Sequence, residues 1–161
     1  MLQNREGQRV PDVTFRTRRD NEWKSVATAE LFAGRTVVVF SLPGAFTPTC
    51  SAQHVPSYVA KYDALKAKGV DEIWCVAVND AFVMGAWARD QKAGGKIRFM
   101  GDGSADFARK LGLELDLTAR GMGVRMQRFS MLVDNGVVRQ LNIEAPGKFE
   151  VSGADTMLGQ L

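Results

Sequence analysis

The stretch that most limits how this chain can fold is residues 36–54, where an apolar run breaks at a proline–glycine pair. The run Val37 to Phe40 is rich in β-branched residues, which is typical of a buried strand, and Pro43-Gly44 ends it. Beyond the loop, apolar residues recur at spacings of four, three and three: Val55, Val59, Tyr62 and Leu65. This periodicity predicts one face of a helix over residues 49–68, with Cys50 in its first turn.

Cys50 stands at a position that favours the nucleophilic form of its sulfur. The unpaired N–H groups and the positive end of the helix dipole stabilise a thiolate there. The alternative is a buried structural cysteine, which is the common fate of a free cysteine. The neighbouring residues 47–51 are polar or turn-forming, which favours the reactive interpretation.

The rest of the chain alternates strands and helices. Residues 10–15 and 23–26 predict an N-terminal β-hairpin about a turn at Asp20-Asn21, and Asn135-Gly136 predicts a second hairpin. Residues 112–126 are mixed in character and predict a long loop with one turn of helix. The other predicted elements are helix 28–32, strand 72–78, helix 79–92, strand 97–100, helix 102–110, strands 129–133 and 137–143, and helix 153–161. This order predicts an α/β domain over 1–161, with a mixed sheet and helices on both faces.

Composition excludes several functional classes. The net charge of +3 comes from scattered residues rather than a basic stripe, so nucleic-acid binding is not expected. No apolar run is long enough to cross a membrane, and the N-terminus lacks a signal-peptide core, so we expect a cytoplasmic protein. Two cysteines 25 residues apart are no disulfide framework, and with His54 as the one histidine we expect no metal site.

Three segments resemble one known family. Pro43-x-x-x-Thr47-x-x-Cys50 resembles the peroxidatic motif of peroxiredoxins, and the wider string from Pro43 to Pro56 resembles their type-five (redoxin) subfamily. The segments 78–83 and 128–131 match that subfamily in order and spacing. The resemblance covers nearly the whole chain. It implies a thioredoxin-like fold and a thiol-dependent peroxidase that reduces hydrogen peroxide and alkyl hydroperoxides through a cysteine sulfenic acid.

The resemblance also assigns the site residues. Cys50 is the expected nucleophile, and Thr47 can both donate to and accept from a peroxide because a hydroxyl does both. Arg128 is the expected active-site cation by its match to the family, with Arg125 as the less favoured substitute, and the residues alone do not choose between them. The expected substrate-binding residues are Pro43, Gly44, Phe46, Thr47 and Arg128.

The regeneration step is predicted from what the sequence lacks. Residues 148–152, where many type-five members carry a resolving cysteine, contain none, and Cys75 lies in an apolar run that predicts buried packing. We therefore expect a one-cysteine enzyme without a cofactor. The resemblance implies glutathione as the reducing co-substrate with glutaredoxin as a partner, thioredoxin being the alternative, and a homodimer.

Two other functions use the same residues. Oxidised Cys50 could act as a peroxide sensor or redox adaptor that changes partner binding without turnover, and an inert Cys50 would leave a binding module. His54, four residues after Cys50, could act as the base of a cysteine hydrolase, but a structural or supporting role is favoured because no third partner is evident.

Overall fold

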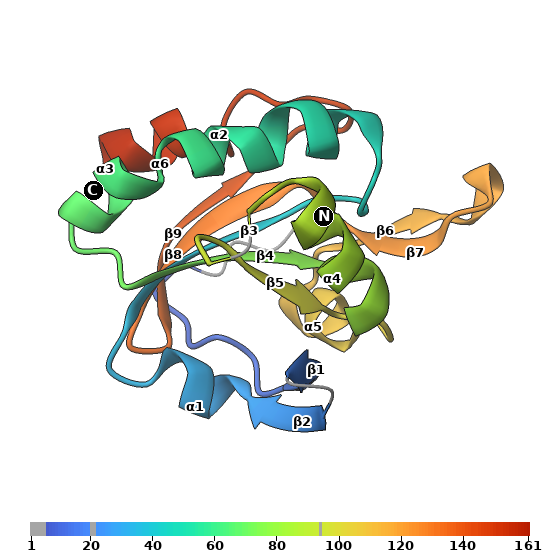
Figure 1. Ribbon diagram of the computed structural model, residues 1–161, viewed down its shortest axis with the longest axis horizontal. Coiled ribbons are helices and arrows are strands. Elements are labelled where there is room, and N and C mark those ends of the chain that lie inside the picture. Colours follow the sequence, from blue (N-terminus) through green and yellow to red (C-terminus); the bar gives the residue numbers. More distant parts are fainter. Residues whose placement is uncertain (1–5, 20–21, 94) are drawn as a thin grey trace.

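A mixed five-stranded sheet forms the centre of the molecule (Figure 1). The computed structural model describes residues 6–19, 22–93 and 95–161. The strand order is β5-β4-β3-β8-β9, with β3, β4 and β5 parallel and with β8 and β9 antiparallel to their neighbours. The strands are β3 (Thr36–Ser41), β4 (Glu72–Ala77), β5 (Arg98–Gly101), β8 (Phe129–Asp134) and β9 (Val137–Ile143). The predicted mixed sheet is confirmed.

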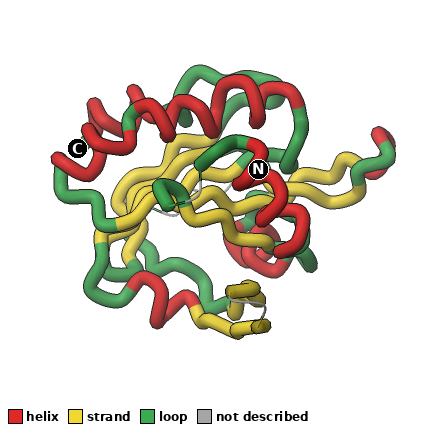
Figure 2. The backbone as a smooth tube through the Cα atoms, viewed as in Figure 1, coloured by secondary structure: helices red, strands yellow, loops and turns green. Residues whose placement is uncertain are grey.

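Helices cover both faces of this sheet because side chains alternate along each strand. In β3, Val37 and Val39 enter one core cluster, whereas Val38 and Phe40 enter the other. Helices α2, α3 and α6 lie over one face and α1 and α5 lie over the opposite face (Figures 1 and 2). The helices are α1 (Thr28–Phe32), α2 (Val55–Ala60), α3 (Tyr62–Ala67), α4 (Ala81–Asp90), α5 (Asp106–Leu111) and α6 (Ala154–Gln160).

The N-terminal hairpin is also confirmed, as a two-stranded sheet of its own. It pairs β1 (Thr14–Arg19) with β2 (Glu22–Ala27) in antiparallel register. Its first strand begins later than residue 10 because the segment before it bonds elsewhere: Val10 N–H donates to the Gly136 carbonyl and Val13 N–H to Thr28 Oγ1. The turn predicted at Asp20-Asn21 lies outside the described residues.

The prediction of a loop over residues 112–126 is wrong. This segment forms an arm of two antiparallel strands, β6 (Glu114–Leu117) and β7 (Gly123–Met126), joined by the 3₁₀ turn η2 (Thr118–Arg120). Gly121 and Gly123 both have positive φ and close the turn. The arm projects from the body of the molecule (Figure 1). Leu115 and Leu117 alternate with polar residues in β6, but each strand of the arm has only four residues, so the strand signal in the sequence is weak.

The helix that carries Cys50 is present but irregular. It begins with a π-helical turn, η1 (Cys50–His54), in which the Val55 N–H donates to the Cys50 carbonyl five residues back. Helix α2 follows, and a break at Lys61 separates it from α3. Pro56 lies two residues after the π turn and has no N–H for the preceding turn, which accounts for the irregular start. π turns of this kind often mark functional sites.

Candidate active site

The sheet register brings the Cys50 loop and Arg128 together. Ser41, the last residue of β3, pairs with Phe129, the first residue of β8. Because these strands are antiparallel, the loop that leaves β3 and the residue that precedes β8 emerge at the same edge. The Ser41 hydroxyl also donates to the Gln127 carbonyl and fixes the chain just before Arg128.

Two polar side chains contact the sulfur of Cys50. Thr47 Oγ1 lies 2.8 Å from Sγ, and Arg128 Nη2 donates to Sγ at 3.2 Å. Thr47 Oγ1 also lies 2.7 Å from the Gly44 carbonyl oxygen, and its single proton can serve one of these two acceptors at a time. Cys50 itself is fully buried. A charged donor on a buried sulfur is an arrangement that stabilises negative charge on that sulfur.

Arg125 supports the loop rather than the sulfur. Its Nη1 lies 3.4 Å from the carbonyl oxygens of Pro43 and Val78. A Cβ at Gly44 would stand 2.7 Å from Arg125 Nη1, so a larger residue there would displace the tip of the Arg125 side chain from its place against the loop. Of the two arginines considered from the sequence, the structure brings Arg128 to Cys50. Arg125 instead contacts the backbone of the Pro43 loop at the Pro43 carbonyl oxygen.

Phe46 stands at the outer end of the same loop. It adopts a left-handed backbone with φ of 64°, which is unfavourable for an aromatic residue, and its side chain is 53% exposed. Its ring lies 6.4 Å from that of Trp87. Phe46 therefore faces the surface beside the site rather than the sulfur.

His54 holds the guanidinium of Arg128 in place. Its Nδ1 lies 2.8 Å from Arg128 Nη1 and its Nε2 lies 3.0 Å from the Ser152 carbonyl oxygen. Arginine only donates, so Nδ1 must accept, and the ring proton sits on Nε2 and is donated to Ser152. Burial and the nearby Arg128 charge lower the pKa of His54 from 6.5 to about 3, against a smaller opposing effect of the Ser152 carbonyl. The imidazole is therefore neutral at pH 7, and it supports Arg128 rather than acting as a base.

A buried carboxylate fixes the far end of this network. Glu144 is 3% exposed and accepts from the backbone N–H groups of Glu150, Val151 and Ser152 at 2.8–2.9 Å, and from the Ser152 hydroxyl at 2.7 Å. Burial alone would raise the pKa of Glu144, but these hydrogen bonds outweigh it and hold the pKa below its ordinary value. The Ser152 carbonyl also accepts from Tyr58 Oη at 2.9 Å.

These contacts form a chain from Glu144 through Ser152, His54 and Arg128 to Cys50. Sequence reasoning placed His54 beside Cys50 from its spacing of four residues, but it did not find Glu144 or Ser152. No spacing rule could have found them, because they lie about 90 or more residues beyond the helix that they support.

Comparison with known proteins identifies the family. A family profile described as Redoxin matches residues 5–158. The chain belongs to the redoxin family. It is 50% identical to the hybrid peroxiredoxin hyPrx5 of Haemophilus influenzae, over 99% of this chain and 67% of that protein. It is 46% identical to peroxiredoxin-2B of Arabidopsis thaliana, over 96% of each chain.

A solved structure gives the same result. The crystal structure of reduced Prx3 from Vibrio vulnificus in complex with H₂O₂ superposes with a TM-score of 0.92 at 50% identity, covering 96% of this chain and 97% of that one. The present chain is therefore a peroxiredoxin with a thioredoxin-like fold, and it has the family's thiol peroxidase function.

The second cysteine of this peroxiredoxin is enclosed in the sheet. Cys75 pairs opposite Phe40 in the middle of β4 and is fully buried. Burial, and then the nearby charge of Cys50, raise the pKa of the Cys75 thiol well above its ordinary value, so it is a poor nucleophile. Both cysteines are free, and both belong to the same core cluster.

A cleft of about 540 Å³ opens in front of the peroxiredoxin site. Three walls form it: the loop and helix start around Cys50, the β6–β7 arm, and the segment Glu144–Lys148. Its lining residues are Pro43, Thr47, Pro48, Thr49, Leu115, Leu117, Arg120, Met122, Gln127, Arg128 and Glu144–Lys148. Thr47 and Arg128 line this cleft and both contact Sγ, so the cleft reaches the two partners of the sulfur.

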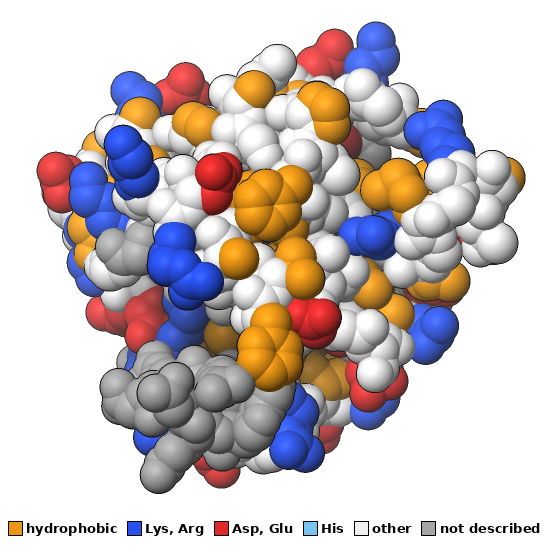
Figure 3. All heavy atoms as spheres, turned by 45° about the vertical axis from the view of Figure 1, so that its right-hand side comes forward, with side chains coloured by type: hydrophobic (Ala, Val, Ile, Leu, Met, Phe, Trp, Pro, Cys, Tyr) orange, Lys and Arg blue, Asp and Glu red, His pale blue; other side chains and the backbone are white. Residues whose placement is uncertain are grey.

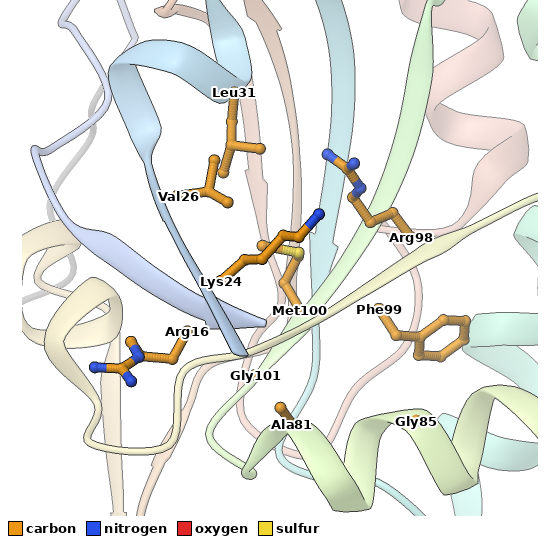
Figure 4. Close-up of a pocket in the computed structure, with 10 residues that line it drawn as sticks. All are labelled: Arg16, Lys24, Val26, Leu31, Ala81, Gly85, Arg98, Phe99, Met100 and Gly101. Carbon is orange, nitrogen blue, oxygen red and sulfur yellow. The ribbon is translucent and has the colours of Figure 1, made fainter. Parts of the chain in front are cut away.

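A smaller cavity of about 170 Å³ lies between the N-terminal hairpin, α4 and β5, away from the predicted site residues. In Figure 4 the Lys24 ammonium and the Arg98 guanidinium lie toward the same part of this cavity, and the Arg16 guanidinium is directed away from them. Within the described residues, no group of three or more His, Cys, Asp or Glu side chains could hold a metal ion. No helix in that part of the chain is long and apolar enough to cross a membrane.

Proposed function

We propose that Cys50 is the peroxidatic residue, that it reduces hydrogen peroxide and alkyl hydroperoxides, and that glutathione with glutaredoxin regenerates it. The observation that supports the first part is the pair of contacts on Sγ, from Thr47 Oγ1 at 2.8 Å and Arg128 Nη2 at 3.2 Å. A thiolate held between a hydroxyl and a guanidinium has both a partner to orient a peroxide and a charge to stabilise the leaving oxygen.

The first step forms a sulfur–oxygen bond. The Cys50 thiolate attacks the terminal oxygen of ROOH, the O–O bond breaks, and the leaving RO⁻ takes a proton to become ROH. Cys50 is oxidised to sulfenic acid and the peroxide is reduced. In this proposal Arg128 stabilises the developing charge, Thr47 orients the peroxide, and Pro43 shields the sulfur from water. Gly44 and Phe46 belong to the loop that shapes the approach.

The second step uses an external thiol. Glutathione attacks the sulfenic acid, the S–O bond breaks, water leaves, and a Cys50–glutathione disulfide remains for glutaredoxin to reduce. The buried Cys75, with its raised thiol pKa, is poorly placed to do this instead. Cys50 is buried as well, so glutathione must approach through the cleft that Thr47 and Arg128 line. A reducing compartment such as the cytoplasm would supply this thiol.

Turnover with glutathione and glutaredoxin tests the proposal, with thioredoxin as the alternative reductant. We expect Cys75→Ser to keep nearly full activity and Cys50→Ser to have none, and mass spectrometry to find glutathione on Cys50. A rapid Cys50–Cys75 disulfide, with activity lost in Cys75→Ser, would make Cys75 the resolving residue. A single stoichiometric oxidation with a captured partner protein would favour the sensor function instead.

We further propose that the protein forms a homodimer. Phe46 and Phe82 are 53% and 54% exposed, although large apolar side chains are usually covered. Figure 3 shows one face of the molecule on which several hydrophobic side chains reach the surface among charged ones. Sedimentation of wild type and of Phe46→Ser tests this: a wild-type monomer at micromolar concentration would refute the dimer.

A further inference from the structure

We infer that the cleft in front of Cys50 selects hydroperoxides that carry a carboxylate on an apolar chain, and that Arg120 and Lys148 bind the carboxylate. The inference deepens the proposed reaction at Cys50 and rests on it. Three observations support it: the size of the cleft, the apolar walls and the distribution of charge along them.

The cleft is far larger than the smallest substrate requires. Hydrogen peroxide has two heavy atoms and needs roughly twice the ~30 Å³ share of a water molecule. The cleft measures about 540 Å³, which lies within the ~300–1,000 Å³ range of pockets that hold whole organic ligands. Its volume therefore suits a hydroperoxide with a substantial organic part.

The walls beyond the reacting atoms are mostly apolar. Leu115, Leu117 and Met122 come from the arm, and Ala145 and Pro146 come from the opposite segment. These side chains offer few hydrogen-bond partners, so they suit a polar ligand such as a peptide poorly. They would pack against a hydrocarbon chain and remove it from water. A substrate in this cleft would place its hydroperoxide at Thr47 and Arg128 and its chain between the two walls.

Two exposed cations line the cleft besides Arg128. Arg120 stands in the turn at the tip of the arm and Lys148 in the opposite segment, and both residues are exposed. Among the described residues, neither side chain forms an ion pair. The one acidic lining residue, Glu144, is already satisfied by three backbone N–H groups and the Ser152 hydroxyl. It does not compete for these two cations.

Arg120 is too far from the sulfur to act on the peroxide itself. Strand β7 covers Gly123–Met126 and lies between Arg120 and Arg128, and at ~3.3 Å per residue it separates them by roughly 13 Å or more. Only a substrate with a chain can therefore contact Arg128 and Arg120 together. The chemistry at Cys50 is unchanged: the sulfur takes the terminal oxygen, and the hydroxy acid leaves.

Stopped-flow oxidation of the reduced protein tests this, with tryptophan fluorescence as the readout, to which Trp87 contributes together with Trp23 and Trp74. Trp87 is suitable because its Nε1 donates to the hydroxyl of Ser51, the residue next to Cys50. The probes are linoleic acid hydroperoxide, its methyl ester and hydrogen peroxide, each below its micelle concentration. We expect the wild type to react about five- to tenfold faster with the acid than with the ester, the size of effect given by two partly exposed ion pairs.

The double variant Arg120→Gln/Lys148→Gln is expected to lose this preference and to keep the wild-type rate with hydrogen peroxide. The matched control, Lys68→Gln/Arg139→Gln, removes the same charge from exposed positions outside the cleft and is expected to keep the preference. This control separates binding in the cleft from long-range attraction.

Four results would overturn the inference. Equal wild-type rates for acid and ester, or a preference that survives in the double variant, would show that these cations do not recognise the substrate. If the double variant instead slowed only the reaction of oxidised Cys50 with glutathione, the cations would serve the reductant. Failure of hydrogen peroxide to oxidise Cys50 would refute the proposed function as well, and that failure is seen before any acid is added.

Discussion

At the scale of single residues, the site depends on which arginine meets the sulfur. Arg128 donates to Cys50 Sγ and to His54 Nδ1, so its guanidinium is fixed at two points. Arg125 instead contacts main-chain carbonyls behind the Pro43 loop. The two side chains are close in sequence but differ in what their charge can stabilise.

Arg128→Ala is therefore expected to slow the oxidation of Cys50 by about a hundredfold to a thousandfold, because removal of a preorganised charged donor commonly costs ~3–4 kcal/mol at the transition state. Arg125→Ala is expected to have a smaller effect, because it loosens the loop without removing charge from the sulfur. Stopped-flow rates with hydrogen peroxide measure both. Equal and small losses in the two variants would show that Arg128 does not have this role.

His54 gives the site a dependence on pH that can be measured through stability. The folded state keeps this imidazole neutral down to about pH 3, whereas the unfolded chain protonates it near pH 6.5. The unfolded state thus binds more protons between these values, so stability falls as the pH is lowered through this window. From pH 6.5 to pH 5 this one group lowers the free energy of unfolding by roughly 1–2 kcal/mol.

His54→Gln provides the matched comparison, because an amide can accept from Arg128 and donate to Ser152 without titrating. Urea unfolding at several pH values is expected to show a shallower loss of stability in this variant than in wild type. The variant is also expected to keep most of the peroxidase rate, whereas His54→Leu, which frees Arg128, is not. Parallel pH profiles for wild type and His54→Gln would contradict the neutral state assigned to His54 in the folded protein.

The sequence predicts the nucleophile and its near neighbours because they lie within one short segment. Thr47 and Cys50 are three residues apart, so their contact at the start of a helix follows from local geometry. Arg128 is 78 residues away, and nothing local places it at the sulfur; its assignment depended on family resemblance. Glu144 gave no signal at all, because a glutamate that accepts backbone N–H groups resembles any surface glutamate in sequence.

At the scale of elements, the segment 144–152 is a loop held by one carboxylate. Glu144 accepts from three successive backbone N–H groups, which fixes the Ser152 carbonyl that His54 donates to. The loop thus helps to position Arg128 through two hydrogen bonds, from His54 Nε2 to the Ser152 carbonyl and from Arg128 Nη1 to His54 Nδ1. Because the carboxylate is buried, these bonds are expected to matter more than those of an exposed side chain.

Glu144→Gln is expected to reduce the free energy of unfolding by ~2–3 kcal/mol, because hydrogen bonds to a charged group are lost and an amide N–H₂ meets other donors. We also expect the oxidation of Cys50 to slow by roughly tenfold as Arg128 loses its support, less than the loss for Arg128→Ala. Glu150→Gln is the control, since Glu150 takes part through its backbone N–H. A lower stability with an unchanged rate would limit Glu144 to a structural role.

Element prediction succeeded for continuous apolar runs and for helical periodicity, and it failed where the strands were short. Strands β3 and β4 are almost fully buried runs and were located to within a residue or so. The β6–β7 arm was missed because each of its strands has only four residues, so the alternation of Leu115 and Leu117 with polar residues is too short to stand out in the sequence. Helix 49–68 was predicted, but its π turn was not. The π turn is caused by Pro56, which lacks an N–H, and hydrophobic periodicity carries no signal for such a turn.

At the scale of the whole molecule, the fold places an open cleft beside the buried sulfur of Cys50. The mixed sheet sets the loop after β3 beside the start of β8, and the helix at Cys50 covers one face of that sheet. The other cysteine, Cys75, lies inside the sheet and packs in the hydrophobic core. The architecture followed from the order of elements in the sequence, whereas the cleft depends on the projecting arm and could not be foreseen without it.

The oxidation rate of Cys50 tests the central claim most directly. Reduced protein carrying Cys75→Ser, so that Cys50 is the one remaining thiol, is mixed with hydrogen peroxide in a stopped-flow instrument at pH 7. If Thr47 and Arg128 activate Cys50, its second-order rate constant will exceed that of a free cysteine thiolate by roughly a thousandfold or more, and Arg128→Ala will remove most of the gain. A rate equal to that of free cysteine would contradict the account.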